Sequence, residues 1–143
     1  MPEQNYQNHV QRVPGFLAFG VVMFLTVIGA CVNLYESWGD HQRMYSASLI
    51  VVLSACVLVL GFYARTFALK AQDRGVRAEE NLRHYVLTGK LLDPRLSLGQ
   101  VIALRFASDA EFVDMAKKAA EQGTAPDEIK RAIKNWRGDT HRV

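Results

Sequence analysis

Side chains able to carry chemistry are sparse in this chain of 143 residues and lie far apart in the sequence. Histidine and cysteine are common zinc ligands, and structural zinc sites space them closely. The four histidines are His9, His41, His84 and His141, and none has a second histidine four residues away. No Cys-x-x-Cys or His-Glu-x-x-His spacing occurs. The sequence therefore predicts no metal site.

Carboxylates that could act as a general acid and base gather in one place, at Asp109, Glu111 and Asp114. They lie at the predicted beginning of a helix, where acidic groups interact favourably with the helix dipole. No serine lies in a Gly-x-Ser-x-Gly context and no glycine-rich phosphate loop occurs. We therefore expect a protein that is not an enzyme and that binds no cofactor.

Two uncharged windows dominate the first half of the chain. Val13–Tyr35 and Met44–Ala64 contain no charged residue over 23 and 21 positions. A helix needs about 20 apolar residues to cross the hydrocarbon core of a membrane. The elements predicted from these windows are transmembrane helices at residues 14–35 and 44–64, joined by a short extracytoplasmic loop at residues 36–43. The absence of ionisable groups within them disfavours an ion or proton pathway.

The charges orient these helices. Residues 1–64 hold two basic and three acidic groups, whereas residues 65–143 hold fifteen basic and eleven acidic groups. Cytoplasmic flanks of membrane helices collect Lys and Arg. We therefore expect a multi-pass protein of the plasma (inner) membrane, with both termini, including the polar segment 1–13, in the cytoplasm. Basic residues beside a membrane attract anionic lipid, and no nucleic-acid partner is expected.

The second membrane helix is predicted to continue into the cytoplasm as a basic helical stalk, residues 65–89. No helix breaker follows Ala64 before Gly75. Three acid-first pairs with i,i+4 spacing also favour a helix: Asp73 with Arg77, Glu79 with Arg83, and Glu80 with His84. The candidate contacts for lipid headgroups are Arg65, Lys70, Arg74 and Arg77.

Small residues recur every seven positions along this helix and would let another helix approach closely. The candidate helix-packing seam is Ala47, Ser54, Gly61 and Ala68, and Gly75 continues it. The seam can pack against the first helix, or it can dock a partner helix or a second copy. The sequence leaves both interpretations open.

The remaining residues, 90–143, are predicted to form a cytoplasmic tail of three short helices. Capping boxes at residues 97–100, 108–111 and 124–127 each supply acceptors for the first N–H groups of a helix. The third helix carries an apolar stripe at helical spacing: Ile129, Ala132, Ile133 and Trp136. The expected fold is all-α: a two-helix transmembrane hairpin, a second helix extended into the cytoplasm, and a small three-helix tail.

Two groups of tail residues have alternative roles. The leucines Leu91, Leu92, Leu96 and Leu98 can cap the helical core or rest in the lipid headgroup region. The candidate partner contacts are Trp136, Arg137 and Arg142. Trp136 can instead close the helical core.

Short motifs in this chain resemble a small uncharacterised bacterial family of two-span membrane proteins. They are Glu3-Gln4-Asn5 with Asn8-His9, the run Leu104–Asp109, and the closing Ile133–Arg137 with Asp139 and Arg142-Val143. The resemblance implies a bacterial plasma-membrane protein and supplies no activity, cofactor or site.

We hypothesise an accessory or scaffold protein that docks to a membrane-protein partner or to itself as a homo-oligomer. The alternative is a membrane-surface sensor or regulator, whose basic stalk and helical tail contact anionic membrane lipid. A subunit of an oligomeric channel or transporter is a third interpretation, which the uncharged spans disfavour.

Overall fold

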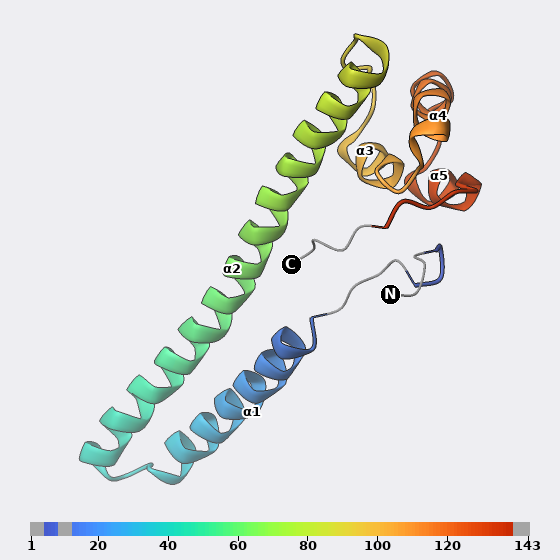
Figure 1. Ribbon diagram of the computed structural model, residues 1–143. Coiled ribbons are helices and arrows are strands. Elements are labelled where there is room, and N and C mark those ends of the chain that lie inside the picture. The colour runs from blue at the N-terminus through green and yellow to red at the C-terminus, as the bar shows by residue number, and fades with distance from the viewer. Residues whose placement is uncertain (1–4, 9–12, 139–143) are drawn as a thin grey trace. The chain divides into compact units, whose positions relative to one another are not determined.

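The computed structural model describes residues 5–8 and 13–138, and over these residues it contains helices and no strand (Figure 1). The helices are α1 (Pro14–Glu36), α2 (His41–Thr88), α3 (Leu98–Leu104), α4 (Asp109–Gln122) and α5 (Pro126–Ala132). The prediction of an all-helical chain with two long apolar helices is confirmed.

The chain divides into two compact units. We call residues 13–68 the helical pair, because they contain α1 and the first half of α2. We call residues 69–138, together with residues 5–8, the C-terminal unit.

Local signals define the ends of α1 and the beginning of α2. Pro14 occupies the first turn of α1, where its missing N–H is not needed. Gly39, in the connecting turn, has a φ of +96°, which favours glycine. Asp40 then caps α2, because its carboxylate accepts hydrogen bonds from the backbone N–H groups of Gln42 and Arg43 at 3.1 and 3.2 Å. The second helix therefore begins inside the segment expected to be loop.

Helix α2 continues without a break to Thr88. Gly75 is tolerated within it, since an interior glycine costs only about 1 kcal/mol relative to alanine. The helix ends where Gly89 adopts a φ of +72° and donates its N–H to the Tyr85 carbonyl at 2.7 Å. The predicted helical extension and its end near Gly89 are confirmed.

Within the helical pair, α1 covers part of the small-residue seam. A Cβ atom added to Gly61 would lie 2.5 Å from Cε1 of Phe19 in α1. Ala47 and Ser54, earlier in the same seam, are only 1% and 7% exposed. These observations favour the interpretation in which this part of the seam packs inside the pair.

Gly61→Leu is expected to destabilise the helical pair by about 1–3 kcal/mol, because its side chain must displace the Phe19 ring. Gly29→Leu is the matched control, since nothing lies within 4 Å of a Cβ atom at Gly29. Thermal unfolding in detergent micelles measures both variants. Phe19→Ala should relieve most of the loss in the Gly61→Leu background, and equal losses at Gly61 and Gly29 would contradict the packing.

The C-terminal unit is built around α3, which packs against both α4 and α5. Its core side chains come from these helices and their connections: Leu92, Leu96, Val101, Ala103, Leu104, Phe106, Ala107, Phe112, Ala116, Ala119, Ile129 and Ile133. Leu92 and Leu96 belong to this core, whereas Leu91 is exposed. The leucines with two possible roles are therefore divided between core and surface.

One predicted capping box forms as expected. The Ser97 hydroxyl accepts from the Gln100 N–H at 3.3 Å, and the Gln100 amide oxygen accepts from the Ser97 N–H at 2.8 Å. At Ser108 the predicted box is wrong, because the buried hydroxyl has no hydrogen-bond partner. Glu111 accepts instead from the backbone N–H groups of Lys134 and Asn135 at 3.3 and 3.2 Å.

The third box is displaced by one residue. Ala125 is the N-cap of α5, and Glu128 rather than Asp127 accepts from its N–H, at 3.4 Å. Asp127 is not free for that role, because its carboxylate accepts a hydrogen bond from the Tyr6 hydroxyl. The box predicted at residues 124–127 is therefore wrong in register.

The stripe predicted to continue α5 to Trp136 is also wrong. The helix ends at Ala132, and the chain then runs antiparallel to residues 106–108. Arg137 N–H donates to the Phe106 carbonyl at 2.7 Å, and the Trp136 ring lies 5.2 Å from the Phe106 ring centroid. Extended backbone therefore carries Trp136 to the core, which it helps to close.

The two serines make a paired prediction. Ser97→Ala is expected to cost about 0.5–2 kcal/mol of stability, the usual loss for an N-cap hydroxyl. Ser108→Ala should be neutral or slightly stabilising, since it removes a buried hydroxyl that makes no hydrogen bond. Hydrogen exchange of the α3 and α4 amides measures both losses in the full chain. A larger loss for Ser108→Ala would contradict the structure.

Candidate functional site

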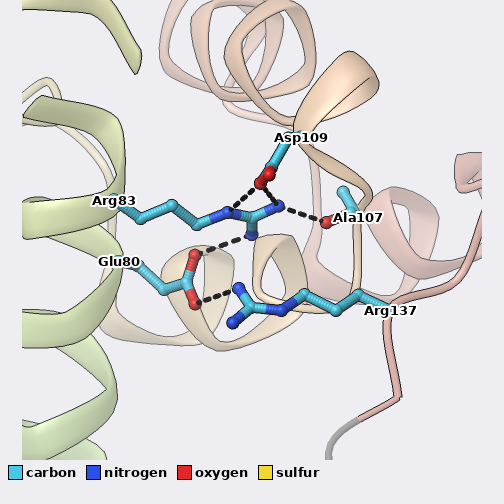
Figure 2. Close-up of polar contacts among 5 residues, drawn as sticks. All are labelled: Glu80, Arg83, Ala107, Asp109 and Arg137. Carbon is cyan, nitrogen blue, oxygen red and sulfur yellow. Dashed lines mark hydrogen bonds and ion pairs between the residues drawn. The ribbon is translucent and has the colours of Figure 1, made fainter. Parts of the chain in front are cut away.

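A partly buried ionic cluster lies at the end of α2 (Figure 2). The side chains of Glu80 and Arg83 are only 6% and 11% exposed. Arg83 donates to Glu80 at 3.0 Å, to the carboxylate of Asp109 at 2.7 Å, and to the carbonyl of Ala107 at 2.8 Å. Its guanidinium also lies 4.2 Å from the centroid of the Phe112 ring. The cluster fastens α2 to the beginning of α4.

The predicted pairing of Glu80 with His84 is wrong. Glu80 pairs with Arg83, three residues on, because Arg83 faces the same buried side of α2. Nδ1 of His84 lies 2.7 Å from the carbonyl oxygen of Lys90. His84 therefore contacts the turn that ends the helix.

The contacts of Arg83 fix the geometry of the cluster. All three guanidinium nitrogens of Arg83 are engaged by protein oxygens. The planar fork of donors in arginine is rigid, so an arginine engaged at each nitrogen holds its partners in fixed positions. The adjoining cleft, of about 500 Å³, is lined by Glu79, Glu80, Leu82, Arg83, Val86, Leu87, Asp109 and Arg137.

The candidate partner contacts have separate environments. Trp136 packs on the core, so its ring is not available as a free surface anchor. Arg137 is 56% exposed, and its Nη1 atom lies 3.8 Å from Glu80 at the edge of the cluster. Arg142 lies outside the described residues.

The candidate lipid contacts differ in what they touch. In the helical pair, the Arg65 guanidinium lies 5.5 Å from the centroid of the Phe16 ring, so it covers an aromatic side chain. In the C-terminal unit, Lys70, Arg74 and Arg77 are exposed. Those three side chains therefore leave their charges available to an external anion.

A contact that the sequence analysis missed joins the N-terminal segment to α5. The Tyr6 hydroxyl donates to Asp127 at 2.8 Å and accepts from Nε of Arg131 at 3.1 Å. The bond with Tyr6 and the charge of Asp127 raise the pKa of Arg131. No local pattern signals this contact, since 121 residues separate Tyr6 from Asp127.

A second exposed ion pair shapes the loop that follows α2. Arg95 donates to both carboxylate oxygens of Asp93, at 3.0 and 2.7 Å. These hydrogen bonds lower the pKa of Asp93 from 3.8 to about 2. A lowered carboxyl pKa stabilises the fold above the ordinary pKa, and this contribution disappears as the pH falls from 3.8 to about 2. The loop geometry is therefore insensitive to pH near neutrality.

Helices α1 and α2 are each long and apolar enough to cross a membrane. The most apolar window of each has a mean hydropathy of 2.4, yet only 6% of the α1 window and 11% of the α2 window are buried. A core helix of a soluble protein would be mostly covered by its own chain. These helices therefore present apolar side chains that the described chain does not cover.

Comparison with known proteins places the whole chain in one family. No curated protein and no solved structure matches it. The family model that matches is described as a family of unknown function (DUF6526), and the match spans residues 1–143. The expected membership of an uncharacterised family is therefore confirmed, and the chain belongs to the family of unknown function DUF6526.

Proposed function

We propose that this protein is a non-enzymatic scaffold of the bacterial plasma membrane. In this proposal α1 and α2 cross the bilayer as a hairpin, and the C-terminal unit docks a protein partner on the cytoplasmic side. The observation that carries the proposal is the pair of long apolar helices whose windows are only 6% and 11% buried. Lipid covers such surfaces at low cost, whereas water does not.

The contact of Tyr6 with α5 supports two crossings. Tyr6 precedes α1, and its bonding partners Asp127 and Arg131 follow α2. Segments that touch must lie on the same side of the membrane, and two crossings return the chain to the side on which it began. The basic excess of residues 65–143 supports the cytoplasm as that side.

The chemistry of the C-terminal unit supports a scaffold role. Arg83 and Glu80 are used for internal contacts, and His84 contacts the helix end. The largely buried charged groups of the cleft, Glu80 and Arg83, therefore hold the fold together, which suits a docking module better than a catalyst.

Labelling of single cysteines tests the topology. In a Cys31→Ala/Cys56→Ala background, cysteine replaces Gln7, Trp38 or Glu121, and all three sites are exposed. A membrane-impermeant maleimide should label Trp38→Cys in intact spheroplasts, and Gln7→Cys and Glu121→Cys only after permeabilisation. Equal labelling of all three in intact spheroplasts would contradict two crossings.

Isolation in a mild detergent tests the scaffold role. The tagged full chain should elute in a complex of defined mass, which native mass spectrometry resolves into its components. A bare monomer, or a bare dimer that contains no other protein, would contradict the scaffold proposal.

The exposed basic residues favour a second function, a sensor of anionic lipid. Lys70, Arg74 and Arg77 follow Ala64 by 6 to 13 residues, which is about 9 to 20 Å of helix. Their charges lie close enough to attract the headgroups of an anionic leaflet.

Nanodiscs of different lipid composition test this second function. Hydrogen exchange around residues 70–77 should slow when phosphatidylglycerol replaces part of the phosphatidylcholine. A triple change of Lys70, Arg74 and Arg77 to glutamine should abolish this difference. Changing Lys117, Lys118 and Lys134 to glutamine removes the same amount of charge elsewhere in the chain. This control should preserve the difference in exchange between the two lipid mixtures. Identical exchange in both lipid mixtures would contradict lipid sensing.

A further inference from the structure

The C-terminal half of α2 has an apolar face that the described chain leaves uncovered. Leu82, Tyr85 and Val86 are 64%, 53% and 74% exposed. At 3.6 residues per turn, Leu82 and Tyr85 point away from Val76 and Glu80, which are buried. Val86 lies at the edge of this face, beside the cleft that it lines together with Leu82. Helix α2 therefore packs one side within the C-terminal unit and presents apolar side chains on the other.

The spacing on this exposed face is that of a coiled coil. The exposed residues Ala71, Gly75, Ala78, Leu82 and Tyr85 follow one another at alternating intervals of four and three. This is the a/d pattern by which one helix packs against another. Leu82 and Tyr85 supply apolar area, and the smaller residues before them permit close approach.

The lipid bilayer does not cover this face. Leu82 and Tyr85 follow Ala64, the last residue of the uncharged window, by 18 and 21 residues. At 1.5 Å per residue, these distances are about 27 and 32 Å along the helix. At this distance from the membrane, another protein surface is what can cover these two side chains.

We propose that the occupant is the same face of a second copy, and that the two α2 extensions form a parallel two-stranded coil. This proposal rests on the membrane topology proposed above. Copies inserted with one topology leave the membrane in the same direction, so their α2 helices run parallel. A twofold axis along the membrane normal then places each residue opposite itself.

Charge complementarity supports the parallel register. In such a coil, a g residue of one helix faces the e residue five positions later on its partner. Arg74 occupies a g position and Glu79 occupies the following e position. The twofold axis therefore creates two Arg74–Glu79 ion pairs between the helices, one on each side of the coil. Both residues are exposed, and no ion pair joins either of them to another residue of the described chain. The neighbouring g and e positions are uncharged: Phe67 with Gln72, and Asn81 with Val86.

Disulfide cross-linking in native membranes tests the interface. In the Cys31→Ala/Cys56→Ala background, Ala78→Cys and Leu82→Cys should give a covalent dimer upon mild oxidation. Arg77→Cys is the matched control, because Arg77 is also exposed and lies on a different side of the helix. Equal cross-linking at all three positions, or none at Ala78 and Leu82, would overturn the proposal.

Charge reversal tests the register. Arg74→Glu and Glu79→Arg should each lower the yield of the Leu82→Cys dimer about fivefold, a change expected for weak exposed ion pairs. The double reversal should restore the yield, because it re-creates opposite charges. Failure of the double variant to recover would overturn the parallel register.

The topology labelling separates the two proposals. Correct labelling at Trp38 without cross-linking overturns the dimer and leaves the membrane topology intact. If Trp38→Cys is not labelled in intact spheroplasts, the proposed topology is contradicted. The reason for a parallel arrangement of the two helices is then lost as well.

Discussion

Arg83→Met is expected to destabilise the C-terminal unit by about 3–5 kcal/mol, because it leaves a buried carboxylate without its partner. Glu80 is only 6% exposed and would retain only Arg137, whose nearest nitrogen is 3.8 Å away. The substitution also removes the hydrogen bond to the Ala107 carbonyl and the cationic group above the Phe112 ring. Asp109 is well exposed, so water can replace its share of the contact.

Hydrogen exchange of α3 and α4 amides in the full chain, held in nanodiscs, measures this loss. A loss of about 3 kcal/mol corresponds to opening more than 100 times as frequent. Arg137→Met is the control and should cost less than about 1 kcal/mol, as an exposed pair does. The double variant Glu80→Met/Arg83→Met should recover much of the stability, since it removes both buried charges. Equal effects of the Arg83 and Arg137 changes would contradict the cluster.

Elements governed by local signals could be predicted from the sequence. Helix α1 begins at Pro14 and follows the uncharged window to one residue beyond its end, and α2 ends where Gly89 takes a positive φ. The Ser97 box forms because Gln100 lies in the same turn. Each of these features depends on residues only a few positions apart.

Features that depend on hydrogen bonds to residues far away in the sequence could not be predicted. The box at Ser108 has a suitable sequence, but Glu111 is taken by the backbone N–H groups of residues 134 and 135. Trp136 lies at helical spacing from Ile129, yet an antiparallel contact with Ala107 places it on extended backbone. In both cases tertiary hydrogen bonds outweigh a local preference, which is worth only about 1 kcal/mol.

The ionic cluster shows the same limit for the candidate site. The sequence indicates that Glu79, Glu80, Arg83 and His84 are suited to pairing along one helix. The sequence does not indicate which side of the helix is buried. Burial of one side is the reason that Glu80 pairs with Arg83 rather than with His84. Asp109, 26 residues away, completes the cluster only after the chain folds. The sequence indicates Arg137 as a candidate partner contact, whereas its observed ion-pair partner is Glu80 of the same chain.

Phe106→Ala is expected to cost about 3–5 kcal/mol, the usual range for a large buried aromatic side chain. Phe106 is fully buried, and its ring lies 5.2 Å from the ring of Trp136. Its backbone carbonyl also accepts a hydrogen bond from the N–H of Arg137 at 2.7 Å. Phe106 therefore holds Trp136 by its ring and Arg137 by its backbone. Loss of the ring removes the surface on which Trp136 packs.

Trp136 itself reports the result. The chain has two tryptophans, and Trp38→Phe leaves Trp136 as the only one. In that background Phe106→Ala should shift the emission of Trp136 to longer wavelength and increase its quenching by iodide, because water reaches the indole. Phe106→Leu is the control that keeps much of the apolar volume, and it should cost less and shift the emission less. An unchanged Trp136 spectrum in the Phe106→Ala variant would show that the indole is held by contacts other than the Phe106 ring.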